Sequence, residues 1–306
     1  MKKILTLLLL ASTTIAFGQK RKLELNLQKD STYYLTSNVK LDIDQLIDNT
    51  HQIVKSTIVG KVAHKVIAVQ DTAYILEVAY KNINMTMDVP GKTISFNSNG
   101  DTTNVLSNLM RNVMNKPFTL IVSKTGRIIG IKNLDNIFMN MFDGLPAIDE
   151  AKKVRLKNEM QKSFGENAIK NNFQEAFVIY PKKDIAINDS WTNNVSLTTT
   201  GISANATAIY TLNGMDDKTY NITGNATIRP EAGGTFKSTN GYYMRLSGIT
   251  GTIVTNLKVD KQSGWITESK VVKKAKGNVQ LKKDINGVII LTYPMVINAE
   301  LLGSNK

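Results

Sequence analysis

The residues that most often perform chemistry in proteins are few in this chain and are not grouped. There are two histidines, His51 and His64, and no cysteine. If both lie on one continuous strand, their separation of 13 residues places them far apart and on opposite faces, because side chains alternate along a strand. Neither belongs to a His-x-x-x-His pair or to a cluster of acidic ligands. We interpret both as ordinary strand residues and predict no metal and no other cofactor.

Motifs for nucleophilic catalysis and for phosphate binding are also missing. The chain has no Gly-x-Ser-x-Gly sequence, and residues 248–251 (Gly-Ile-Thr-Gly) are not followed by the Lys-Ser/Thr of a phosphate loop. The absence of cysteine excludes thiol, iron–sulfur and Cys-based zinc chemistry. We therefore predict no catalytic residues and favour a protein that is not an enzyme; a hydrolase of unknown type stays as an alternative.

A row of lysines suggests an anion-contact face. Four of them alternate with apolar residues along one predicted strand: Lys270, Lys274, Lys276 and Lys282. The other side of that strand carries Val271, Ala275, Val279 and Leu281, with Lys273 as an exception. Such a row could bind anions, or it could be a solvated outer face that discourages edge pairing.

Apolar residues at helical spacing give a second candidate site. Residues 104–116 and 134–142 each place an apolar stripe on one helix face. The residues that could line an adaptable apolar cavity are Leu109, Met110, Met114, Phe138 and Met141. The alternative is ordinary packing of these helices on a sheet.

The elements that would position these residues are mostly strands. Alternation at period two predicts strands at residues 39–43, 52–69 and 73–87, and a C-terminal antiparallel meander of five strands, the last at residues 288–299. Between these regions, residues 134–177 predict helix: the stripe at 134–142 ends near residues 144–146, and residues 149–177 are charged and amphipathic.

The predicted fold is α+β and β-dominated, with two antiparallel meander sheets and helices packed on them. We divide the chain into a signal segment (1–18), an N-terminal sheet with a helical insert (19–180) and a C-terminal meander (181–306). Residues 122–128 and 71–75 are echoed by residues 259–266 and 217–222. A duplicated sheet unit and shared hairpin chemistry both explain this echo.

The first 18 residues have the order of a secretory signal peptide. Lys2 and Lys3 precede an apolar run at residues 4–10, and small residues occupy Ala16 and Gly18, which predicts cleavage between Gly18 and Gln19. The apolar run is shorter than the roughly 20 residues that span a bilayer. No cysteine follows the predicted cut, so we expect a soluble periplasmic or extracellular protein, not a lipoprotein, with no transmembrane segment in the mature chain.

The chain of 306 residues is strongly basic, with a formal net charge of +13 at pH 7. A basic exported protein encounters lipid phosphates and acidic polymers, although charge alone also serves solubility. Possible partners are therefore anionic envelope polymers, with no specific nucleic acid.

Several short motifs resemble those of one protein family: residues 17–19 (Phe-Gly-Gln), 71–74 (Asp-Thr-Ala-Tyr), 124–128 (Lys-Thr-Gly-Arg-Ile), 188–191 (Asn-Asp-Ser-Trp) and 259–265 (Val-Asp-Lys…Gly-Trp). Together they are similar to a family of exported Bacteroidota proteins of unknown function. The resemblance implies export and a β-rich fold and brings no catalytic residue or ligand.

Curved sheets closed by helices often leave concave space for apolar molecules. The first hypothesis is therefore a non-catalytic binding or carrier protein of the cell envelope for a lipid or another apolar small molecule. The alternative is an interaction or scaffold module that contacts anionic envelope polymers through its Lys-rich sheet face.

Overall fold

The structure is a computed structural model. It describes residues 20–100, 103–145, 148–176, 179–199, 202–230, 235–239 and 241–306. The predicted signal segment, with Gly18 and Gln19, lies outside the described residues.

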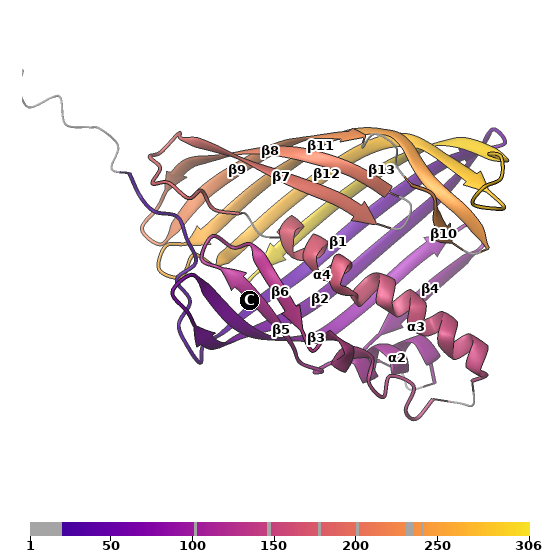
Figure 1. Cartoon of the computed structure of the whole chain (residues 1–306), viewed down its shortest axis with the longest axis horizontal. Helices are drawn as coiled ribbons and strands as arrows, with labels where there is room; N and C mark the ends of the chain where they lie inside the picture. The colour runs from indigo at the N-terminus through magenta and orange to yellow at the C-terminus, as the bar shows by residue number, and fades with distance from the viewer. Residues whose placement is uncertain are drawn as a thin grey trace, which may run out of the picture.

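A single antiparallel sheet of 13 strands forms the body of the protein (Figure 1). Its strands are β1 (Thr32–Ile47), β2 (Thr50–Val69), β3 (Ala73–Val89), β4 (Lys92–Asn97), β5 (Phe118–Ser123), β6 (Ile128–Lys132), β7 (Ser190–Thr199), β8 (Ile202–Met215), β9 (Thr219–Pro230), β10 (Lys237–Thr239), β11 (Tyr242–Asp260), β12 (Ile266–Lys282) and β13 (Leu291–Ser304). The spatial order is β6-β5-β3-β2-β1-β13-β12-β11-β9-β8-β7, with β4 beside β3 and β10 beside β11.

The β-dominated prediction is confirmed, and the prediction of two separate sheets is wrong. The first strand, β1, pairs with the last, β13, from Thr36 opposite Ser304 to Gln45 opposite Met295. This pairing satisfies backbone groups that would otherwise form two open edges, and it joins the N-terminal and C-terminal strands into one sheet. The C-terminal meander is present, as the neighbours β13, β12, β11, β9 and β8.

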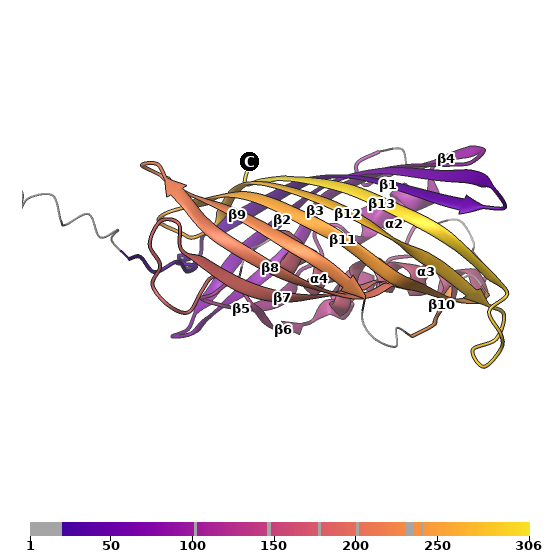
Figure 2. The ribbon, with the colours of Figure 1, turned by 90° about the horizontal axis from the view of Figure 1, so that it is seen from above.

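The two faces of the sheet differ in composition, as alternation requires. On β12 the buried side chains Val271, Ala275 and Val279 share one face, here called the inner face, while Lys274 and Lys276 are exposed on the opposite, outer face. The helices lie on the inner side of the curved sheet (Figure 2). The inner face is therefore the face on which the core forms.

In the described part of the chain, four helical segments lie between the strands: α2 (Val105–Val113), the 3-10 helix η1 (Leu134–Phe138), α3 (Glu150–Phe164) and α4 (Glu166–Ala176). The side chains of Asn104 and Asp149 accept hydrogen bonds from backbone N–H groups in the first turns of α2 and α3. α2 agrees with the helix expected at residues 104–116. At 134–142 the structure has only the short η1 followed by turns, so the helix expected there is shorter than predicted.

One end of the sheet is closed by two extended segments, residues 20–30 and 179–189. The first bridges turns from both halves of the chain: Leu25 N donates to Lys124 O (2.7 Å) and Asn26 N donates to Ser263 O (2.7 Å). The second packs against β7, where Trp191 Nε1 donates to Ile179 O (2.8 Å). These segments tie the two halves together at this end.

The echoed sequences occupy hairpin turns at that same closed end. Lys124 N donates to Thr72 O (3.0 Å), and Lys261 N donates to Lys218 O (2.8 Å). A backbone hydrogen bond thus joins the β5–β6 turn to the β2–β3 turn. In the other half of the chain, an equivalent hydrogen bond joins the β11–β12 turn to the β8–β9 turn. A repeated unit and common hairpin chemistry both predict such a correspondence.

The buried residues form two separate clusters on the inner face. The larger, cluster one, joins residues 20–30 and the helices to the closed end of the sheet and includes Trp265, Tyr74 and Phe173. The smaller, cluster two, includes Ile228, Val279 and Met295 and contains strand residues only. Between the two clusters lies a stretch of inner face on β1, β2, β3 and β13 whose side chains belong to neither.

Candidate ligand-binding face

Aliphatic side chains that belong to neither cluster line the inner face between them. We call this set the inner strip: Val39, Leu41, Val54, Ile58, Met85, Met87, Ala299 and Leu301. All eight are half-buried. Each therefore keeps part of its apolar surface in contact with solvent.

Strand pairing makes the inner strip continuous. Val39 lies opposite Ile58 on one side and opposite Leu301 on the other. Ile58 lies opposite Met85, and Leu41 lies opposite Ala299. Neighbouring strands are about 4.8 Å apart, so β3, β2, β1 and β13 together present an apolar surface about 15 Å wide.

The strip is half-open because the helices pack chiefly beyond it. Phe164 of α3 packs edge-on against Tyr80 (centroids 5.2 Å apart), and Phe173 of α4 packs against His64 (6.1 Å). Among the α3 side chains, Met160 and Phe164, both near its C-terminal end, are the buried ones. The rest of α3 contributes half-buried or exposed side chains and leaves the strip accessible.

A single cation stands on this apolar surface. Among the described inner-face residues of β1, β2, β9, β11, β12 and β13, Lys273 alone carries a charge at neutral pH; its register neighbours are Ile253 and Ala299. His64, also on the inner face, is neutral there because burial lowers its pKa to about 4. The described inner face of these six strands therefore combines a broad apolar area with one positive group.

The four lysines predicted as an anion-contact face all lie on the outer face. Lys270 Nζ is 2.7 Å from Glu300 Oε1, and this hydrogen bond and charge lower the pKa of Glu300. Lys274 and Lys276 are exposed. Lys282 lies over the Phe236 ring, 4.5 Å from its centroid. At about 3.3 Å per residue, Lys270 and Lys282 are about 40 Å apart, so the four form a row and not a pocket.

The five residues predicted to line an apolar cavity, Leu109, Met110, Met114, Phe138 and Met141, all lie in cluster one. Each is at most 9% exposed. They pack between the helices and the sheet, and none of them belongs to the inner strip.

A shallow groove of about 640 Å³, with a mixed polar and apolar lining, lies where β2, β3 and β4 meet the start of α2. Its polar lining includes the amides of Asn84, Asn97 and Asn104 with the hydroxyls of Thr57 and Ser107, and its apolar lining is Val59, Met85 and Phe96. Asn104 and Ser107 already form the helix cap. The groove is uncharged and was not expected from the sequence.

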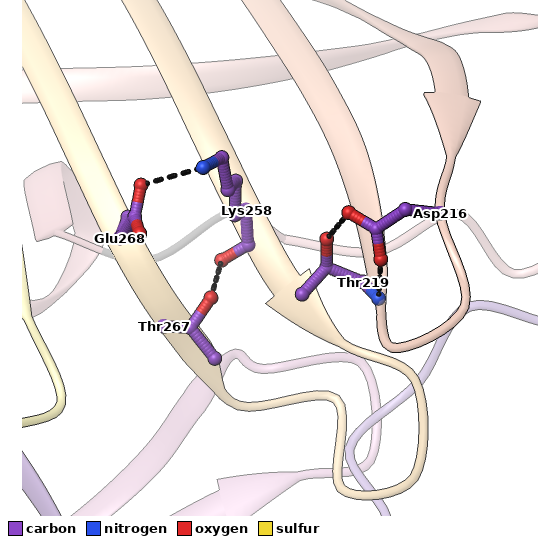
Figure 3. Close-up of polar contacts among 5 residues, drawn as sticks. All are labelled: Asp216, Thr219, Lys258, Thr267 and Glu268. Carbon is purple, nitrogen blue, oxygen red and sulfur yellow. Dashed lines mark hydrogen bonds and ion pairs between the residues drawn. The ribbon is translucent and has the colours of Figure 1, made fainter.

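Polar groups near the turns at the closed end satisfy one another locally (Figure 3). Asp216 accepts hydrogen bonds from the backbone N–H and the hydroxyl of Thr219, both at 2.7 Å, and these bonds lower the pKa of Asp216 to about 2. Lys258 pairs with Glu268 at 2.9 Å, which raises the pKa of Lys258. These groups stabilise the β8–β9 turn and the outer face of β11 and β12.

The two histidines lie on opposite faces, as predicted. His51 is exposed on the outer face, with Nδ1 2.8 Å from Asp44 Oδ1, and His64 is buried on the inner face. No group of three or more His, Cys, Asp or Glu side chains among the described residues could hold a metal ion.

The fold and the site define a class of protein: a curved antiparallel sheet whose inner face holds helices at one end and an accessible apolar strip beside them. No helix within the described part of the chain is both long and apolar enough to cross a bilayer. Residues 71–266 match the family described as "Family of unknown function (DUF6263)", and the chain belongs to that family.

Other comparisons add little. No curated protein matches the chain. Among solved structures it is similar to lipovitellin, in a study of lipid–protein interactions (12% identity, 92% of this chain, TM-score 0.49), and to an outer membrane channel from Pseudomonas putida F1 (5% identity, 91% of this chain and 97% of that chain, TM-score 0.25). The chain spans about a quarter of the lipovitellin chain, covering 25% of it. Neither likeness is strong enough to bear on function.

Proposed function

We propose that this protein is a non-catalytic carrier of the cell envelope that holds an apolar ligand on the inner strip. The observation that carries the proposal is the continuous set of half-buried aliphatic side chains on β3, β2, β1 and β13. A filled core would bury these side chains as completely as it buries Leu76 and Val66, which are 0% exposed.

The strip is large enough to bind an acyl chain. With eight half-exposed side chains, a ligand would cover roughly 300 Å² of apolar surface, which contributes about 7 kcal/mol before the entropic cost of association. That amount suits reversible binding. The half-buried strip keeps contact with solvent, and α3 buries only Met160 and Phe164, so a ligand can reach the strip from the solvent side.

Lys273 favours an amphiphile over a pure hydrocarbon. Lys273 is half-buried between its register neighbours Ile253 and Ala299, and at a partly desolvated position an anionic head group is attracted more strongly than in bulk water. A single-chain molecule that ends in a carboxylate or phosphate matches the strip with its tail and Lys273 with its head.

The envelope location belongs to the same proposal. Its support is the signal pattern of residues 1–18, with Lys2 and Lys3 before the apolar run and small residues at Ala16 and Gly18. Cleavage after Gly18 would release the chain from residue 19 onward. N-terminal sequencing of the exported protein tests this step.

Binding is tested with the chain from residue 19 to 306. Solvent extraction followed by mass spectrometry should find a co-purified amphiphile, and a fluorescent fatty acid should bind. The double variant Val39→Asn/Ile58→Asn should weaken that binding at least about tenfold, because it places two amides in the strip. Val254→Asn is the matched control, since Val254 is 42% exposed on the outer face.

Equal binding by the strip variant and the control variant would refute the proposal, and so would a wild-type chain that binds neither the probe nor a natural amphiphile. Thermal melting of each variant establishes that the compared proteins are folded.

A second function rests on Lys274 and Lys276, which are exposed on the outer face and form no described ion pair. These lysines would contact anionic envelope polymers. Pull-down on lipopolysaccharide or peptidoglycan should weaken as salt rises, since exposed charges are screened. Lys274→Gln/Lys276→Gln should reduce the retained fraction, and unchanged retention would exclude these lysines.

A further inference from the structure

The loop between β12 and β13 exposes four aliphatic side chains at its tip. Val288 is 80% exposed, Ile290 49%, Ile285 42% and Ile289 40%. The sequence predicted a strand from Val288, but β13 begins at Leu291, so residues 288–290 precede the strand. In Figure 2 this loop, coloured gold at the lower right, projects beyond the ends of the strands.

The loop has a defined backbone, so its apolar exposure is a feature of the folded chain. Gly287 N donates to Asp284 O (3.0 Å), and Asn286 N donates to Asp284 Oδ1 (2.8 Å). Ile290 N donates to Leu281 O (2.9 Å) across the base of the loop. These bonds close the turn and leave the aliphatic side chains facing solvent.

Cations surround the base of this apolar tip. Lys282 and Lys283 precede it in the sequence. Two cations lie over the Phe236 ring. Lys282 Nζ, from β12, is 4.5 Å from the ring centroid, and Arg245 Cζ, from β11, is 4.6 Å from it. The loop's one acidic side chain, Asp284, accepts a hydrogen bond from within the loop. The result is an apolar tip with a positive collar.

We infer that this tip is a membrane-docking element that inserts its aliphatic side chains into the surface of an anionic bilayer. Apolar side chains enter the boundary between head groups and acyl chains, while nearby Lys and Arg meet anionic lipid phosphates; each such cation adds about 1 kcal/mol, or about fivefold in affinity.

A second copy of the chain is a poorer occupant for the tip. Contact between two identical tips would bring Lys282 and Lys283 of both copies together, and like charges repel. An anionic bilayer matches both halves of the feature, its aliphatic tip and its cationic collar. The inference goes beyond the carrier proposal and does not depend on it.

Vesicle sedimentation tests the inference with the chain from residue 19 to 306. We expect binding to vesicles of phosphatidylcholine with phosphatidylglycerol, and little binding to phosphatidylcholine alone. Val288→Ser/Ile289→Ser should weaken the binding about tenfold. Lys282→Gln/Lys283→Gln should weaken it about 30-fold. Lys29→Gln/Lys65→Gln, with the same change of charge at exposed positions of the closed end, should retain more of the binding.

Insertion has its own readout. In an Ile289→Trp variant, the fluorescence of the added tryptophan should shift to the blue when anionic vesicles are added, and not when a soluble polyanion such as heparin is added. The inference is overturned if the wild-type chain does not sediment with anionic vesicles, if the Val288→Ser/Ile289→Ser variant sediments equally well, or if the tip variants abolish self-association instead. All tip variants should keep the fluorescent fatty acid bound, so failure of docking and failure of the carrier proposal are distinguishable.

Discussion

The stability of this protein should fall as the pH is lowered from 7 to 5, and His64 should be the cause. The ring of His64 is 3% exposed and lies against Trp265, with ring centroids 5.1 Å apart. Burial lowers the pKa of His64 to about 4, although a backbone hydrogen bond at Tyr33 acts in the opposite direction. In the unfolded chain the pKa of this group returns to its ordinary value of 6.5.

The sign follows from proton binding. Below pH 6.5 the unfolded chain takes up a proton on His64 that the folded chain does not, so lowering the pH stabilises the unfolded state. With pKa values of 6.5 and about 4, the free energy of unfolding should fall by about 2 kcal/mol between pH 7 and pH 5, and by about 3 kcal/mol at pH 4. The range from pH 7 to 5 lies above the ordinary pKa values of Asp216 (3.8) and Glu300 (4.5), which are lowered in the folded chain, so these carboxylates lose their contribution only below it; the change at pH 4 already includes part of that loss.

Urea unfolding at pH 7, 6 and 5 measures this effect. His64→Gln should unfold at lower urea overall, but its free energy of unfolding should lose most of the pH dependence. His51→Gln is the matched control, because the His51 side chain is 61% exposed on the outer face and should leave the slope intact. A His64→Gln variant with the wild-type slope would refute the reasoning.

Two further predictions concern the turn at the closed end and the inner face. Gly264→Ala should destabilise the protein by about 3 kcal/mol in urea unfolding, because φ is +67° and an added Cβ would lie 2.1 Å from Glu24 O. Gly91→Ala is the control: φ is +82° and nothing lies within 4 Å of an added Cβ, so this change should cost only about 1 kcal/mol. Equal costs would show that the contact with Glu24 does not matter. Lys273→Met should weaken binding of a fluorescent fatty acid and spare its methyl ester; equal loss for both would remove Lys273 from head-group binding.

Local patterns predicted most of the strands, because neighbouring strands in this sheet are mostly joined by tight turns. The alternation from Ile202 through β8 and β9 and the turn at residues 261–264 are short-range features that a sequence displays directly. The pairing of β1 with β13 is different, since Thr36 and Ser304 are separated by almost the whole chain. The sequence of neither strand indicates which strand it pairs with, so the single sheet was predicted as two sheets.

The inner strip could not be predicted for a related reason. Val39 and Leu41 alternate with polar residues whether their face is filled or open, and Leu109 and Met110 show an equally apolar pattern yet are buried. Exposure depends on what covers a face. Here that is the placement of α3 and α4, which tertiary packing determines.

The boundary between cluster one and the inner strip explains how an open apolar face coexists with a stable sheet. It runs through Gly60, Ser37, Gly303 and Ser269, which are register neighbours across β2, β1, β13 and β12. A Cβ on Gly303 would lie 2.3 Å from Ser269 Oγ, so the flanking side chains close over this row. Because these residues are small, no large apolar side chain of this row connects cluster one with the inner strip. The stabilising contacts then lie on one side of the row, and the strip on the other side is free to exchange solvent for a ligand.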